Sequence, residues 1–177
     1  MNILFVCSSN ICRSPFCEIL FRRMVSEDEK LSLSVEKISS AAVLNQSFKI
    51  HPKAVLALRR EGFKDEEIYA HKPRFKWLAW KDFKDADLII GMNKANKVFT
   101  PLPFQKKFKT LSELAIGEDV FISDPWLMKD INDYYKVMDL IKDYLEKFAQ
   151  NLKGSIWKLK ISTLWTICTF YDKLLCD

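Results

Sequence analysis

The chain opens with the stretch Asn2-Ile3-Leu4-Phe5-Val6-Cys7-Ser8-Ser9-Asn10-Ile11-Cys12-Arg13-Ser14-Pro15. Its first part is a short apolar run, and it predicts a buried strand of a parallel sheet over residues 2–7. Its last two residues predict the start of a helix, with Ser14 as the N-cap and Pro15 as the first helical residue. Apolar residues at helical spacing extend that helix over residues 15–26. The stretch therefore predicts a strand, a tight loop and a helix in direct succession.

The loop between this strand and this helix carries a cysteine and an arginine in Cys-x5-Arg spacing. A loop of this length can turn its backbone N–H groups inward as an anion-binding nest, and the N-terminal end of the helix adds positive potential. Arg13 offers a planar fork for two phosphate oxygens, and the positive field favours the thiolate form of Cys7. The pattern indicates covalent phosphoryl-transfer chemistry with Cys7 as nucleophile. A buried structural cysteine is the alternative that the spacing alone leaves open.

Strand and helix patterns alternate along the rest of the chain. Further strands are expected at residues 33–39, 86–91 and 108–112, and further helices at residues 52–60, 93–100 and 130–152. Such alternation predicts an α/β fold with a parallel sheet and helices on both faces, and 177 residues suit a single domain. Ligands of such sheets bind at the carboxyl ends of strands, which is where Cys7 would lie.

The composition narrows the class of protein and its compartment. With 29% charged residues and a net charge of +5, the chain has the balance of an ordinary globular surface, and we expect no nucleic-acid partner. The five cysteines show no disulfide-framework spacing, which favours a reducing cytoplasm. The two histidines lie far from the cysteines in sequence, so we expect no metal site. We also expect no signal peptide and no transmembrane segment.

The last part of the chain, residues 153–177, is an apolar extension of a domain that we place at residues 1–152. Gly154 and Ser155 predict a break between the two. If the extension is helical, its large apolar side chains share one face: Trp157, Ile161, Leu164, Trp165, Cys168, Tyr171 and Leu175. One interpretation is a segment that packs on the domain or forms an unstructured tail. The other is a helix that docks on a membrane surface or a partner.

The opening loop resembles the phosphate loop of the low-molecular-weight protein tyrosine phosphatase family, Val-Cys-x-Gly-Asn-x-Cys-Arg-Ser-Pro. A second resemblance is an Asp-Pro pair followed by an aromatic residue, here Asp124-Pro125-Trp126. Weaker similarities, at Ala70-His71-Lys72 and at residues 87–92, lie between these two motifs in the order expected for the family. The resemblance covers most of residues 1–152. It implies a Rossmann-like fold with about four parallel strands, and no cofactor.

The resemblance also implies an activity and roles for individual residues. A protein of this family hydrolyses phosphotyrosine in protein substrates through a cysteinyl-phosphate, here on Cys7. Arg13 would bind the phosphate, and Asp124 would protonate the leaving phenolic oxygen and then activate water. The expected substrate-binding residues are Ser8, Ser9, Asn10, Ile11, Cys12, Ser14 and Trp126, and the expected supporting residues are His71 and either Ser39 or Ser40, of which we favour Ser39. In the family, the counterpart of Cys12 is a reversible disulfide partner of the nucleophile.

One departure from the family pattern bears on activity. Ser9 replaces the glycine of the loop and would be strained if its φ were positive. Ser9 and the apolar extension motivate one alternative, a non-catalytic module that binds phosphate or tethers a partner. Another alternative is a thiol-dependent arsenate reductase, which needs a cysteine pair in mid-chain. The chain has no cysteine between Cys17 and Cys168, which argues against this activity.

Overall fold

The computed structural model describes the backbone of residues 1–174 and the side chains of residues 1–154. Within this part, four strands form one parallel sheet in the order β2-β1-β3-β4. The strands are β1 (Asn2–Cys7), β2 (Lys37–Ala42), β3 (Leu88–Gly91) and β4 (Phe108–Thr110). The predicted α/β architecture with a small parallel sheet is confirmed.

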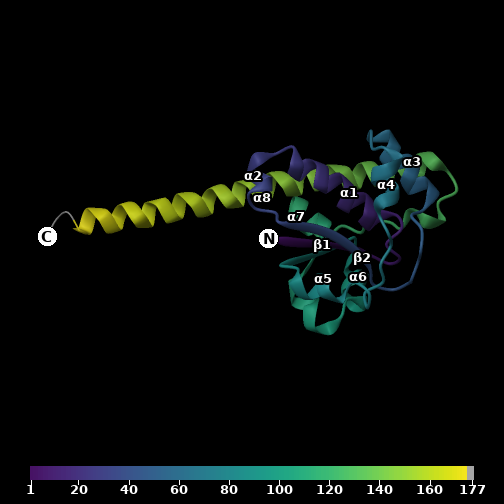
Figure 1. Ribbon diagram of the computed structural model, residues 1–177, viewed down its shortest axis with the longest axis horizontal. Coiled ribbons are helices and arrows are strands. Elements are labelled where there is room, and N and C mark those ends of the chain that lie inside the picture. Colours follow the sequence, from purple (N-terminus) through teal and green to yellow (C-terminus); the bar gives the residue numbers. More distant parts are fainter. Residues whose placement is uncertain (175–177) are drawn as a thin grey trace.

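Helices cover both faces of this sheet. Figure 1 shows α1, α3, α4 and α8 on one side of the strands and α5 and α6 on the other. The α-helices are α1 (Arg13–Ser26), α2 (Glu29–Ser32), α3 (Pro52–Arg60), α4 (Asp65–Ala70), α5 (Trp80–Asp85), α6 (Lys94–Phe99), α7 (Leu111–Ile116) and α8 (Ile131–Leu174). Two 3-10 helices, η1 (Leu102–Lys107) and η2 (Pro125–Leu127), complete the described part of the chain.

The alternating residues of β1 divide the interior into two cores. Ile3 and Phe5 point into the larger core with α1, α3 and α8. Leu4 and Val6 point into the smaller core, which α5 and η1 cover. A strand that is buried on both faces is apolar at successive positions, and this explains the continuous run at the start of the sequence.

The strand order places the end of β1 at the centre of the sheet. β1 lies between β2 and β3, so the chain leaves β1 toward one edge of the sheet and later returns on the other side. Cys7 is the last residue of β1 and lies opposite Ala42 in β2, while Val6 lies opposite Gly91 in β3. Ligands of open α/β sheets bind at such a switch point, so Cys7 lies where this fold is expected to bind a ligand.

Two predicted boundaries near the N-terminus are wrong. The second strand covers 37–42 rather than 33–39, because the Asp28 side chain accepts a hydrogen bond from the Leu31 backbone at 3.1 Å and caps the short helix α2. Helix α1 begins at Arg13, with Cys12 in the N-cap position, so Ser14 is not its cap.

The C-terminal helix also differs from its prediction. We expected a break at Gly154, but α8 is continuous from Ile131 to Leu174 and extends well beyond the rest of the fold in Figure 1. A helix tolerates an isolated glycine at a cost of about 1 kcal/mol, so this residue alone does not end it. The predicted apolar face, from Trp157 to Leu175, lies outside the residues whose side chains are described. No helix in the described part of the chain is apolar enough over a sufficient length to span a membrane.

Candidate active site

The loop after β1 curls around the Cys7 side chain. Asn10 has a φ of 55°, in the left-handed region that asparagine tolerates, and it is the one non-glycine residue with positive φ in the described part of the chain. Ser9 is therefore not in a strained conformation, which answers the concern raised by the missing glycine. No protein group among the described residues accepts a hydrogen bond from the backbone N–H groups of residues 9–12. These donors are available for an anion, as in a nest.

Side-chain hydrogen bonds fix the shape of this loop. The Cys7 Sγ lies 3.0 Å from the Ser14 Oγ, and both residues are buried. Asn10 Nδ2 donates to the Ser14 Oγ at 2.9 Å and to the Ser40 Oγ at 2.7 Å, while its Oδ1 accepts from the Arg74 backbone N–H at 2.9 Å. Asn10 thus links the nucleophile's hydroxyl neighbour to β2 and to the segment before α5.

A second set of contacts supports Asn10 from behind. Ser40 also donates to Glu18, and the His71 ring lies 3.4 Å from both the Glu18 carboxylate and the Asn10 carbonyl. Burial acts to raise the pKa of Glu18, but hydrogen bonds from His71 and Ser40 and the nearby Arg22 charge hold it below its usual range. The prediction of His71 near the loop agrees with this geometry.

The residue of β2 that supports the loop is Ser40, so the prediction that favoured Ser39 is wrong. Successive side chains of a strand point to opposite faces of the sheet. Since Ser40 points toward Asn10 and Glu18, Ser39 points away from the loop, and it lines a separate cavity to which His71 also contributes.

Arg13 connects the loop to the segment that carries Asp124. Its guanidinium is buried and donates to the Ile122 carbonyl at 3.2 Å and to the Asp124 carboxylate. Its Nε is buried without a partner among the described residues, so the side chain keeps a donor for a ligand. The other oxygen of Asp124 accepts from the Trp126 backbone N–H at 3.2 Å, which caps η2. The loop after β1 and the segment around Asp124 are far apart in the sequence, and Arg13 brings them together at one site.

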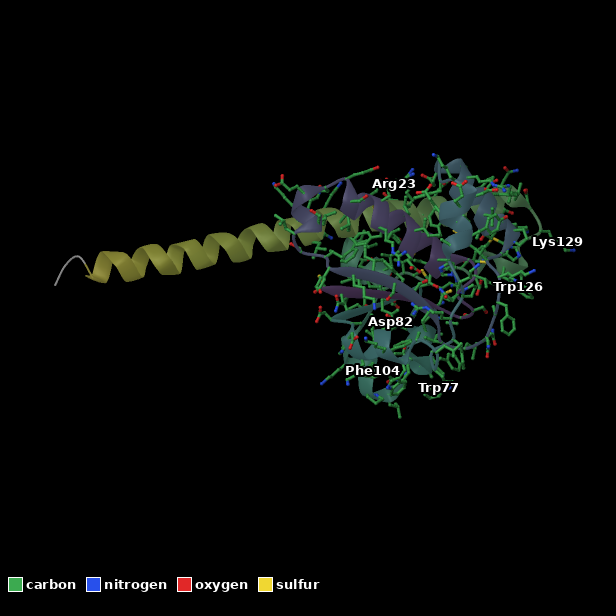
Figure 2. The ribbon with its side chains drawn as sticks, in the orientation of Figure 1. Arg23, Trp77, Asp82, Phe104, Trp126 and Lys129 are labelled. Carbon is green, nitrogen blue, oxygen red and sulfur yellow. The ribbon has the colours of Figure 1, made fainter. Side chains whose placement is uncertain are left out.

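A cavity of about 460 Å³ opens over this arrangement. Its walls contain most of the predicted site residues, and the lining comprises Cys7, Ser8, Ser9, Ile11, Cys12, Arg13, Leu44, Asn45, Ser47, Asp124 and Trp126. Figure 2 shows Trp126 on the outside of the molecule, and 55% of this residue is exposed. Asn10 and Ser14 lie beneath the cavity as supports rather than in its lining.

The segment after β2 contributes three lining residues that the sequence did not suggest, Leu44, Asn45 and Ser47. The Leu44 and Asn45 backbone N–H groups donate to the Ser8 carbonyl at 3.0 and 2.9 Å. The Asn45 side chain donates to the Ser9 hydroxyl at 3.2 Å. Because Cys7 lies opposite Ala42, the parallel register would have placed this segment beside the loop if β2 had been predicted over the correct residues.

The other two described cysteines differ from Cys7 in their surroundings. Burial raises the pKa of the Cys12 thiol to about 12, although a hydrogen bond with Tyr134 opposes this shift. Burial also raises the pKa of Cys17 well above its usual value. All three cysteines are free of disulfides. Among the described residues, no group of three or more histidine, cysteine or acidic side chains could hold a metal ion.

Comparison with known proteins agrees with this geometry. The family model of low molecular weight phosphotyrosine protein phosphatases matches residues 2–157. The chain belongs to this family. It is a phosphatase, and neither the arsenate reductase nor the non-catalytic alternative gains support.

Relatives within the family differ in the names of their substrates. A protein-arginine-phosphatase of Bacillus subtilis is 29% identical over 156 residues, 86% of this chain and 97% of the relative. The low molecular weight protein-tyrosine-phosphatase PtpB of Staphylococcus epidermidis is 28% identical over 148 residues, 80% of this chain and 94% of the relative. Among solved structures, the C7S mutant of the YwlE arginine phosphatase, with a phosphorylated active-site serine, has a TM-score of 0.74 at 28% identity and covers 86% of this chain and 96% of its own.

Proposed function

We propose that this phosphatase hydrolyses phosphotyrosine in proteins through a cysteinyl-phosphate on Cys7. The observation that supports this most is a single cavity that joins Cys7, a loop with unpaired backbone donors, Arg13 and Asp124. A phosphate monoester needs a nucleophile, donors for its equatorial oxygens and an acid for the leaving group. The described residues supply one group for each of these needs.

The reaction would proceed in two steps. In the first, the Cys7 thiolate attacks phosphorus, the bond from phosphorus to the tyrosine oxygen breaks, and Asp124 gives its proton to that oxygen. In the second, water attacks the cysteinyl-phosphate, Asp124 takes a proton from the water, and the sulfur–phosphorus bond breaks to regenerate the thiolate. Arg13 and the N–H groups of residues 9–12 stabilise the equatorial oxygens in both steps, and Ser14 stabilises the thiolate.

The apolar rim of the cavity favours an aryl phosphate as the substrate. Ile11, Leu44 and Trp126 give it apolar walls, and the exposed indole of Trp126 can stack on a flat ring. A tyrosine side chain holds its phosphate farther from the peptide backbone than a serine does. The combination therefore suits phosphotyrosine better than phosphoserine.

A second candidate substrate is phosphoarginine, which we infer from the name of the Bacillus subtilis relative. A guanidinium leaving group is polar and would require acceptors at the rim. The lining offers Asn45, Ser47 and the Asp124 carboxylate for this purpose. The apolar rim makes phosphotyrosine our first choice.

The deciding experiment compares kcat/KM on peptides of one sequence that carry phosphotyrosine, phosphoarginine or phosphoserine. Cys7→Ser serves as the blank. We expect phosphotyrosine to be the best substrate, and Trp126→Ala to lower its kcat/KM about tenfold through lost stacking, with inhibition by inorganic phosphate unchanged. Fastest turnover of phosphoarginine would contradict the proposed substrate but not the chemistry of Cys7. No turnover of any peptide by folded protein would contradict both.

We also place the enzyme in the cytoplasm, where a nucleophilic thiol stays reduced. The free state of the three described cysteines supports this placement. Localisation of the tagged protein by cell fractionation tests it, and recovery from an oxidising compartment would contradict it.

A further inference from the structure

Exposed apolar side chains gather on the outer surface of the layer formed by α5, α6 and η1. We call this surface the tryptophan face; it comprises Trp77, Leu78, Trp80, Val98, Phe99 and Leu102. The most exposed members are Leu102 at 82%, Val98 at 73% and Leu78 at 70%, and Trp77 is 62% exposed. Large apolar side chains in one contiguous exposed area mark an interaction surface rather than a random scatter.

Ring contacts and a hydrogen bond join the segments that carry the face. The Trp77 and Trp80 rings stack with their centroids 5.6 Å apart, and Trp80 meets the buried ring of Phe104 at 5.0 Å. The Lys76 ammonium donates to the Phe99 carbonyl at 3.1 Å, which joins the segment before α5 to the end of α6. Figure 2 shows Trp77 and Phe104 on the same side of the molecule, apart from Trp126. None of the six residues lines the active-site cavity.

The residues around the tryptophan face are mostly cationic; the acidic residues of α5 are Asp82, which is buried and pairs with Lys37 and Arg74, and Asp85 at the end of the helix. Residues 71–81 contain four lysines or arginines and residues 94–109 contain five, and neither segment contains an aspartate or glutamate. Of these nine cations, Arg74 and Lys94 pair with carboxylates, and the other seven form no ion pair within the described residues. The overall composition predicted an ordinary globular surface, but these two segments place cations beside the exposed aromatic side chains.

We propose that the tryptophan face docks the enzyme on an anionic phospholipid surface. Tryptophan side chains favour the interface between lipid and water, and aliphatic side chains such as Leu78 and Leu102 can enter its apolar part. Unpaired lysines are attracted to anionic headgroups, so the face combines the two signals that stable peripheral binding requires. Nucleic acid would use the cations but would gain little from exposed leucine and valine side chains.

The position of the face is compatible with activity at a membrane. It covers the smaller core, on the side of the sheet opposite α1 and α8. Because its residues and the cavity lining do not overlap, docking leaves the cavity open to phosphorylated proteins near the membrane.

Co-sedimentation of the full chain with lipid vesicles tests the proposal. We expect binding to vesicles of phosphatidylcholine mixed with phosphatidylserine, little binding to phosphatidylcholine alone, and weaker binding at high salt. Trp77→Gln with Leu102→Gln should lower the partition coefficient about tenfold or more. Lys81→Gln with Lys106→Gln should lower it about 25-fold, since each lysine contributes about fivefold.

Matched controls separate the face from general effects of charge and hydrophobicity. Leu33→Gln removes an apolar side chain that is 73% exposed outside the face, and Lys136→Gln with Lys147→Gln removes two charges from α8. Both controls should bind like the wild type, and all variants should keep its turnover of para-nitrophenyl phosphate, which verifies folding. If the double variant Trp77→Gln/Leu102→Gln bound as tightly as the wild type, the proposal would be refuted, because binding would then come from another part of the chain. No binding of the wild type to either vesicle would refute it as well, and would leave an acidic protein as the partner to test.

Discussion

Replacing Asn10 by alanine should both destabilise the protein and impair catalysis. The change removes three side-chain hydrogen bonds, two donated to Ser14 and Ser40 and one accepted from Arg74. At about 1 kcal/mol each, these contribute about 3 kcal/mol to stability. Alanine in the left-handed region adds about 1 kcal/mol, since φ is 55°. The expected loss of about 4 kcal/mol is a large part of the 5–15 kcal/mol typical of a whole domain.

Asn10→Gly separates the two contributions, because glycine adopts positive φ freely but makes no side-chain hydrogen bond. We expect it to lose about 3 kcal/mol, so that it is about 1 kcal/mol more stable than the alanine variant. Urea unfolding measures both values, and kcat/KM on para-nitrophenyl phosphate should fall about 10²-fold in each variant, since small displacements of the loop misplace the nucleophile. Two variants that unfold and turn over like the wild type would show that Asn10 does not hold the loop.

Three further predictions concern the acid, the thiols and the sheet. Asp124→Asn should lower kcat on phosphotyrosine by about 10²–10⁴-fold but have a smaller effect on a substrate with a more acidic phenol; an equal loss on both would contradict a role as general acid. At neutral pH, iodoacetamide should modify Cys7 and spare Cys12, whose pKa is raised to about 12 by burial and which therefore stays a thiol; peptide mapping that finds both modified at one rate would oppose this. Gly91→Ala should lower the free energy of unfolding in urea by about 1–3 kcal/mol, because the added Cβ would lie 2.2 Å from the Phe108 ring. The double variant Gly91→Ala/Phe108→Leu should recover part of this loss. A single variant as stable as the wild type would show that the ring moves freely.

The parts of the fold that could be predicted are those in which several local signals agree. The strand at residues 2–7 and the helix at residues 52–60 have the predicted bounds. The first is apolar at every position from Ile3 to the loop, and the second has proline in its first turn and glycine after its end.

The errors arise where a short segment satisfies two patterns at once. Residues 33–39 alternate loosely, but the cap at Asp28 favours a turn of helix first and shifts the strand toward residue 42. The preference for Ser39 over Ser40 came from the resemblance to the family, which does not show which of two neighbouring strand residues faces the site. The contributions of Leu44 and Asn45 depend on their contacts with the loop after β1, which lies far from them in sequence, so no pattern within one segment can show them.

The most direct test of the proposed chemistry is to trap the covalent intermediate. Asp124→Ala should slow the second step, because no base then activates water, so phosphoenzyme should accumulate during turnover of a substrate with a very acidic phenol. Rapid denaturation followed by peptide mass spectrometry should find one phosphoryl group, on Cys7, and none in the Cys7→Ala variant. Turnover without a phosphorylated Cys7, or phosphate on another residue, would contradict the account.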